Sequence, residues 1–273
     1  MLFRSGPPLS VHTPRGPLAA DLEQLLVGDD GPSRRYVASK HRTAGEIGIR
    51  SVGVELPATA SQAQVEAEVA RLATDASVHG ILVQMPLPGH LDPERVLALI
   101  PAAKDVDGLT EASLGRLVRG VPGHVGCTPL GVMRLLDHHG IATSGRRAAV
   151  IGRSTLVGLP MALLLAQKGV DATVTLAHSR TTDMVAVCRE ADIIVSATGI
   201  ARSITAAHVK PGAAVIDVGI SRTDAGIVGD VDFDAVQGVA GAVTPMPGGT
   251  GLLTVACLME NTVAAAAMQG VRV

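Results

Sequence analysis

Four short apolar runs in the second half of the chain, separated by segments of helical length, most constrain its fold. They cover residues 148–151, 172–177, 193–198 and 213–218. Strands that are apolar on both faces are typical of parallel sheets covered by helices on both sides. We therefore predict an α/β protein with a Rossmann-like, doubly wound parallel sheet in this half.

The first of these runs leads through a glycine-containing turn, residues 152–158, into a helix-like segment. This turn is the usual phosphate site of a doubly wound sheet, because the helix N-terminus offers free N–H groups. Gly152 permits the tight turn and Gly158 permits close backbone approach. The spacing is not G-x-G-x-x-G, so this turn alone indicates a dinucleotide only weakly.

The second run ends in His178-Ser179-Arg180, with no carboxylate before Asp183. An NAD-preferring site normally places Asp or Glu here to bind the ribose 2′-hydroxyl. The polar and cationic run instead favours NADP, with Arg153, Ser179 and Arg180 as candidates for the 2′-phosphate. A merely solvated Arg180 is the alternative, and it predicts equal affinity for NAD and NADP.

Composition predicts a cytoplasmic globular protein. Of the 273 residues, 47% are hydrophobic, which is ample for a core, and the net charge is −2. The 23 basic and 25 acidic residues are intermixed, so we expect neither a nucleic-acid nor a membrane partner. The N-terminus has no apolar signal segment. The three cysteines are widely spaced, which indicates a reduced compartment and no metal site.

Tyr36 is the only tyrosine in a chain without Trp, and it stands four residues before Lys40. On a helix this spacing puts both side chains on one face, about 5–6 Å apart. The pair could therefore address one small molecule, although the spacing is common. The pattern Tyr-x-x-x-Lys is also the catalytic signature of short-chain dehydrogenases. In that family the pair follows the nucleotide turn, whereas Tyr36 precedes Gly152, so the order argues against that family.

Three further segments of the first half carry polar residues at suggestive places. Gln84 stands where the apolar run 80–85 meets two prolines, Asp105 and Asp107 alternate, and Thr128-Pro129 opens a helix-like segment. Each has an ordinary structural explanation as a loop or helix cap. Singly, they therefore prove nothing.

Together these segments form an ordered series from about residue 20 to 265. The series comprises 26–30, 36–40, 83–88, 104–108, 127–129, 150–154, 157–158, 217–220, 229–231 and 244–249. It closely resembles the bifunctional methylenetetrahydrofolate dehydrogenase/cyclohydrolase family. The resemblance implies an NADP-dependent oxidation of 5,10-methylenetetrahydrofolate to the methenyl form, followed by hydrolysis to 10-formyltetrahydrofolate.

The resemblance also implies site residues. Lys40, Tyr36, Gln84 and Asp107 occupy catalytic positions, and Leu252 joins Tyr36, Gln84 and Asp107 in binding the folate. The cofactor residues it implies are Gly152, Arg153, Ser154, Gly158, Ser179, Arg180, Thr198, Gly219 and Ile220.

Each catalytic role has a chemical rationale. Hydride transfer needs positioning more than an acid or base, because two nitrogens stabilise the cation that forms. Hydrolysis needs proton management, which Lys40 can supply if burial and a nearby cation lower its pKa. Gln84 can orient this lysine without holding it charged. Asp107 can accept paired N–H bonds from the pterin, and Tyr36 can lie against its ring.

The expected architecture is two domains with a cleft between them. A catalytic, folate-binding domain is expected at residues 1–143 plus 251–273, and the NADP-binding domain at 144–250. A terminal helix from Leu253 to Met268 should pack on the first domain, with its four-alanine stretch in close helix packing. The resemblance further implies a homodimer through the nucleotide domain.

Some residues depart from the family pattern. Residues 18–26 replace an early strand and place apolar residues at helical spacing. Thr155 and Leu159 replace a frequent Asn and Arg, and Thr250 and Leu252 change a loop that borders the folate. These changes leave open a specialised paralogue with one activity. A non-catalytic dinucleotide-binding regulator is a separate alternative, and the presence of Tyr36, Lys40, Gln84 and Asp107 together argues against it.

Overall fold

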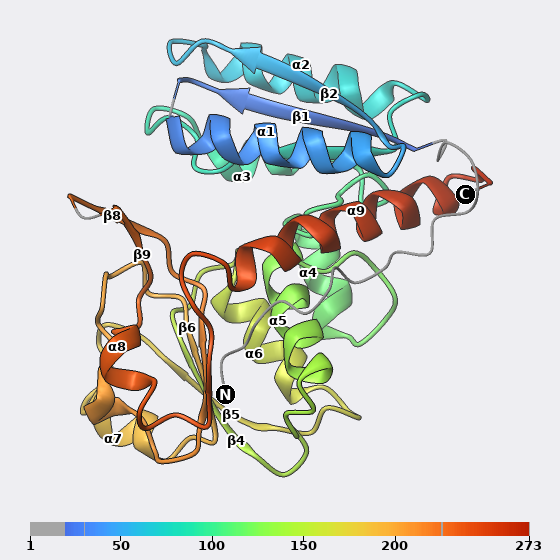
Figure 1. Ribbon diagram of the computed structural model, residues 1–273. Helices are drawn as coiled ribbons and strands as arrows, with labels where there is room; N and C mark the ends of the chain where they lie inside the picture. The colour runs from blue at the N-terminus through green and yellow to red at the C-terminus, as the bar shows by residue number, and fades with distance from the viewer. Residues whose placement is uncertain (1–19, 30, 225, 273) are drawn as a thin grey trace. The chain divides into compact units, whose positions relative to one another are not determined.

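The structure, a computed structural model, describes residues 20–29, 31–224 and 226–272 (Figure 1). Two compact α/β units are present in this part of the chain. The first unit comprises residues 20–127 together with 257–272, and the second unit comprises residues 128–256. The predicted N-terminal features at residues 1–19 lie outside the described residues.

The first unit is built on a three-stranded parallel sheet in the order β2-β1-β3. β1 (Asp21–Val27) lies in the centre and pairs with β2 (Arg50–Leu56) and β3 (Gly80–Val83). The helices of this unit include α1 (Gly31–Glu46), α2 (Gln62–Thr74), α3 (Pro93–Leu97) and α4 (Glu111–Val118). Apolar residues of β1, α2, β3 and α3 form one buried cluster, which fixes the end of β3.

The helical interpretation of residues 18–26 is wrong, because Asp21–Val27 form the central strand. A strand covered on both faces is apolar at successive positions, so its pattern can match a helical one over a short run. The strand even buries Gln24, whose Nε2 donates to Ser51 Oγ on β2 at 2.8 Å. This pairing makes a polar residue tolerable in the middle of the sheet.

The second unit contains a five-stranded parallel sheet in the order β10-β7-β6-β4-β5, which confirms the predicted fold class. Its strands are β4 (Arg147–Ile151), β5 (Thr173–Ala177), β6 (Ile193–Ser196), β7 (Ala214–Asp217) and β10 (Ala242–Val243). All four predicted apolar runs are strands. From β4 the chain goes first to one neighbour, β5, and then crosses to the other, β6, so the carboxyl ends of β4 and β6 mark the topological switch point.

Shorter elements complete the second unit. They are α6 (Gly158–Ala166), α7 (Met184–Arg189), the 3₁₀ turn η1 (Ala206–His208), α8 (Phe233–Val236), and the antiparallel pair β8 (Ser221–Thr223) and β9 (Gly226–Val228). Two helices, α5 (Cys127–His138) and α9 (Thr250–Met268), each contribute residues to both units.

The C-terminal part of α9, from Cys257 on, belongs to the first unit, whereas its first residues, up to Ala256, belong to the second. Asn261 Nδ2 donates to the Val106 carbonyl oxygen at 2.8 Å, and Gln269 Nε2 donates to that of His79 at 2.8 Å. α9 is 19 residues long and apolar enough to qualify as a membrane span by length and composition, but 50% of the segment is buried inside the protein. Core helices of globular proteins meet the same criteria, so this is weak evidence for a membrane.

Candidate active site

The first unit brings Lys40 and Gln84 into contact. Lys40 lies on α1 with 4% of its surface exposed, and its Nζ donates to Gln84 Oε1 at 3.1 Å. Gln84 directly follows β3, and its Nε2 donates to the Met85 carbonyl oxygen at 2.8 Å. Because the amide nitrogen is engaged in this way, the amide oxygen faces the lysine. Lys40 therefore has an uncharged hydrogen-bond acceptor as its partner.

Tyr36 lies one turn earlier on α1 and faces the same lysine. Lys40 Nζ is 4.8 Å from the centroid of the Tyr36 ring, a distance at which the ring face attracts a cation. The two side chains thus share one side of α1, as their spacing predicted. The half-buried phenol adjoins a nearly buried amine.

The loop that carries Asp107 is fixed by hydrogen bonds on both sides. Asp105 accepts two backbone N–H groups from residues 109 and 110 at 3.1 and 2.9 Å. The Val106 carbonyl oxygen accepts from Asn261 Nδ2 at 2.8 Å and from Cys127 Sγ at 3.3 Å. Asp107 is consequently held on a loop whose neighbours on each side have little freedom.

Burial dominates the protonation of this site. It lowers the pKa of Lys40 below its ordinary value, and the charge of Asp107 opposes that shift. Burial likewise raises the pKa of Asp107, against the charge of Lys40 and a hydrogen bond from Cys127. Our expectation that a nearby cation helps to lower the Lys40 pKa stays a prediction, because among the described residues the principal charge that acts on Lys40 is the carboxylate of Asp107. Within the part of the chain that the structure describes, burial is the cause that lowers this pKa.

In the second unit, glycines shape the turn after β4. Gly152 has a φ of +119°, and a Cβ there would lie 2.2 Å from the Ala197 carbonyl oxygen. A Cβ on Gly158 would lie 2.0 Å from the Gly152 carbonyl oxygen. The backbone that comes close to Gly158 is therefore the start of the same turn. Ser154 Oγ accepts the Val157 N–H at 3.2 Å and closes the turn before α6 begins. Only glycine fits at either position.

All but one of the predicted cofactor residues follow strands of the second sheet. Gly152, Arg153 and Ser154 follow β4, Ser179 and Arg180 follow β5, Thr198 follows β6, and Gly219 and Ile220 follow β7, while Gly158 begins α6. The carboxyl ends of parallel strands share one edge of the sheet, which is where such sheets bind nucleotides. Arg153, Ser179 and Arg180 are exposed, so cationic and hydroxyl groups that fit a phosphate are available there.

Family comparisons match most of the chain. The tetrahydrofolate dehydrogenase/cyclohydrolase catalytic domain matches residues 12–107, and the NAD(P)-binding domain of the same family matches residues 126–270. The chain belongs to the tetrahydrofolate dehydrogenase/cyclohydrolase family. A curated relative, the bifunctional protein FolD of Acidiphilium cryptum, is 52% identical over 252 residues, which cover 92% of this chain and 90% of the relative.

Solved structures of tetrahydrofolate dehydrogenase/cyclohydrolases have the same fold. The bifunctional FolD of Campylobacter jejuni has a TM-score of 0.88 and 42% identity, with 92% of this chain and 89% of that chain covered. The Trypanosoma brucei FolD, solved with NADP cofactor and an inhibitor, has a TM-score of 0.87 and 39% identity, covering 93% and 88%. The similarity thus spans both units.

Leu252, the remaining predicted folate contact, belongs to the second unit, near the start of α9. Its side chain is 59% exposed. Tyr36, Lys40, Gln84 and Asp107 belong to the first unit, so its predicted contact with the same folate stays a prediction. Thr250, another departure from the tetrahydrofolate dehydrogenase/cyclohydrolase pattern, is buried, and its Oγ1 donates to the Asp217 carbonyl oxygen at 3.1 Å.

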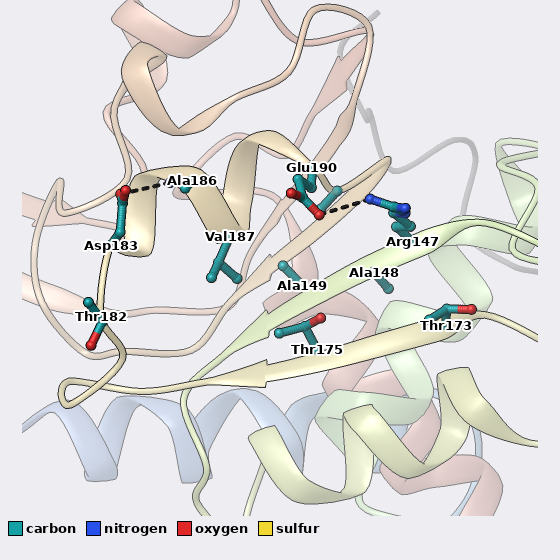
Figure 2. Close-up of a pocket in the computed structure, with 11 residues that line it drawn as sticks. Arg147, Ala148, Ala149, Thr173, Thr175, Thr182, Asp183, Ala186, Val187 and Glu190 are labelled. Atoms are coloured by element: carbon teal, nitrogen blue, oxygen red, sulfur yellow. Dashed lines mark hydrogen bonds and ion pairs between the residues drawn. The ribbon is translucent and has the colours of Figure 1, made fainter.

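A cavity of about 380 Å³ lies between α7 and the strands β4 and β5 (Figure 2). Arg147 and Glu190 form an ion pair of 2.8 Å at one end of α7, and Asp183 caps the other end by accepting the Ala186 N–H at 3.0 Å. None of the predicted cofactor residues lines this cavity. It is distinct from the strand ends that carry those residues.

Sequence reasoning quoted Asp217 and Asp230 only as parts of family motifs and missed their placement. Both carboxylates are buried, and they interact with the loops after β6 and β7. Burial raises the pKa of Asp217 to about 6, although backbone N–H groups donate to it. The signal in the sequence is a glycine close to each aspartate, Gly219 two residues after Asp217 and Gly229 directly before Asp230. The structure explains both glycines, because a Cβ on either would lie within 2.0 Å of the carboxylate of the other motif.

Proposed function

We infer that this chain oxidises 5,10-methylenetetrahydrofolate with NADP and hydrolyses the resulting methenyl compound to 10-formyltetrahydrofolate. The family match over both domains carries the inference, and the contact between a nearly buried Lys40 and Gln84 supports it. A non-enzymatic regulator has no need of such a pair. The activity makes the chain both an oxidoreductase and a hydrolase of one-carbon metabolism.

Lys40 is the proposed catalyst of hydrolysis. Water attacks the methenyl carbon, and the neutral amine accepts a proton from that water. The resulting ammonium then donates this proton to the ring nitrogen as its bond to that carbon breaks. The hydroxyl of the adduct loses its remaining proton to solvent and becomes the carbonyl of the formyl group, which stays on the other nitrogen. Burial favours the neutral amine at the start of this cycle, and Gln84 Oε1 accepts a hydrogen bond from either form.

Tyr36 and Asp107 are proposed to position the folate. Asp107 can accept two N–H bonds from the amino-pyrimidinone edge, and its fixed loop makes that edge a reproducible anchor. Tyr36 offers a ring face to the pterin. Leu252 is proposed as an apolar contact to the same substrate.

NADP, when bound, supplies the hydride acceptor for the oxidation. Gly152, Ser154 and Gly158 are proposed to shape the turn that receives its pyrophosphate. Arg153, Ser179 and Arg180 are proposed to hold the 2′-phosphate. The remaining proposed contacts are Thr198, Gly219 and Ile220.

We also propose a homodimer formed through the nucleotide domain, and a cytoplasmic location. The proposed domain limits are residues 1–143 plus 251–273 for the folate-binding domain and 144–250 for the NADP-binding domain. The intermixed charges and moderate net charge of −2 support a globular enzyme that acts on a small molecule.

One experiment tests the proposed function. Purified protein is mixed with methylenetetrahydrofolate and NADP, and methenyltetrahydrofolate is followed by absorbance as it forms. The decay of added methenyltetrahydrofolate is followed separately without NADP. We expect both activities. Only one activity would identify a specialised paralogue, and neither activity in a folded protein that binds NADP would identify a regulator.

A further inference from the structure

Asp230 contacts two loops that carry predicted cofactor residues. Its Oδ2 accepts hydrogen bonds from the backbone N–H groups of Thr198 and Gly199, at 2.6 and 3.2 Å. Ser196 Oγ, at the end of β6, donates to the same oxygen at 3.1 Å. One carboxylate oxygen thereby fixes the direction in which the chain leaves β6.

The other oxygen of Asp230 faces the loop after β7. A Cβ on Gly219 would lie 1.8 Å from Asp230 Oδ1, so this carboxylate takes the space that a side chain at position 219 would need. Oδ1 is buried, and no donor among the described residues forms a hydrogen bond with it. An unpaired buried carboxylate oxygen is costly, and such atoms call for a functional explanation.

Asp230 is itself held by Asp217. Asp217 Oδ1 accepts the N–H groups of Asp230 and Gly219, each at 3.0 Å, and its Oδ2 accepts that of Val231 at 2.9 Å. Asp217 is anchored in turn, because its N–H donates to Thr244 Oγ1 at 2.7 Å. The carboxylate of Asp230 is therefore fixed in place by backbone contacts before any ligand binds.

We propose that Asp230 is a positioning residue for NADP, holding the loops after β6 and β7 in the conformation that receives the cofactor. The inference rests on the proposed cofactor residues Thr198, Gly219 and Ile220. The Thr198 hydroxyl is engaged within this loop, where it accepts the Ile200 N–H at 3.1 Å and pairs with Ser203 Oγ at 3.3 Å. The bonds from the Thr198 and Gly199 N–H groups to Asp230 therefore fix the position of the loop as a whole. Removing the carboxylate releases two backbone donors and opens a space beside Gly219.

The bifunctional reaction supplies an internal control, since hydrolysis of methenyltetrahydrofolate needs no NADP. We expect Asp230→Ala to weaken the NADP Kd, measured by calorimetry well below the unfolding temperature, by about tenfold or more. Asp230→Asn keeps one acceptor oxygen and should weaken it less. The cyclohydrolase kcat should stay within about twofold in both. Asp234→Ala, an exposed carboxylate on α8, is the matched control and should bind NADP like the wild type.

Unchanged NADP affinity in Asp230→Ala overturns the inference about Asp230 but leaves the proposed function standing. The same holds if NADP affinity and the rate of hydrolysis fall by the same factor. If Asp230→Ala does not fold, Ser196→Ala decides, because it removes a single donor to Oδ2. A weakening of the NADP Kd by at least about twofold, with hydrolysis intact, supports the proposal, and an unchanged Kd overturns it. A folded wild-type protein that does not bind NADP overturns the proposed function as well.

Discussion

Replacing Gln84 with Glu places a carboxylate beside Lys40 with almost no change in shape. The present partner of Lys40 is a neutral amide oxygen at 3.1 Å. An opposite charge this close typically shifts a pKa by about 1–3 units towards the charged form, or about 1.4–4 kcal/mol. The shift raises the pKa of Lys40, because a carboxylate favours the ammonium.

The neutral fraction of Lys40 falls tenfold for each unit of that shift, at any pH below its pKa. We therefore expect the cyclohydrolase rate of Gln84→Glu, at pH values below the wild-type pKa of Lys40, to fall about 10- to 1000-fold, and its rise with pH to move about 1–3 units higher. Hydrolysis of methenyltetrahydrofolate is measured by absorbance across the pH range. The NADP-dependent oxidation should fall much less, since it needs no base.

Gln84→Met is the matched control for that variant. It also loses the Nε2 donor to the Met85 carbonyl oxygen but introduces no charge. Its pH profile should lie close to that of the wild type, even if its rate is lower. A Gln84→Glu enzyme with the wild-type rate and pH profile refutes the idea that hydrolysis depends on neutral Lys40.

Three further predictions concern the second unit. Arg180→Ala should raise the KM for NADP about tenfold or more in steady-state kinetics and leave that for NAD unchanged; equal effects on both argue against a 2′-phosphate contact. Gly158→Ala should destabilise the protein by at least about 2 kcal/mol in denaturant unfolding, because its Cβ would meet the Gly152 carbonyl oxygen at 2.0 Å. The control is Gly115→Ala in α4, where an added Cβ would meet no other atom, and it should stabilise the protein by about 0.5–1 kcal/mol. If Gly115→Ala is less stable than Gly158→Ala, the steric argument is rejected. Thr250→Val should lower the unfolding temperature by about 2–4 °C through the lost bond to Asp217, and an unchanged temperature shows that the bond adds nothing.

Sequence predicts the second sheet well and the start of the first sheet poorly, for one physical reason. The runs that became β4 to β7 are apolar throughout, and turn residues separate them from helical segments. β1 is equally buried but contains Glu23 and Gln24. A strand with buried polar residues looks amphipathic, and only the structure shows that a tertiary partner, Ser51, accepts a hydrogen bond from Gln24 Nε2.

The candidate site divides in a similar way. The i, i+4 spacing of Tyr36 and Lys40 is a local property, so sequence could predict their shared helix face. The charge that the carboxylate of Asp107 places beside Lys40 depends on which distant loop packs there, and this cannot be predicted from local spacing. Asp230 was missed because its role depends on contacts with residues 31 to 34 positions earlier in the chain.

The most direct test of the central claim is the ratio of the two activities in Lys40→Met. Methionine keeps the length and apolar stem of the side chain but cannot accept or donate a proton. The account predicts that hydrolysis of methenyltetrahydrofolate is lost by a factor of about 100 or more, while NADP-dependent oxidation of methylenetetrahydrofolate persists. Full cyclohydrolase activity in Lys40→Met contradicts the assignment of Lys40 as the catalyst.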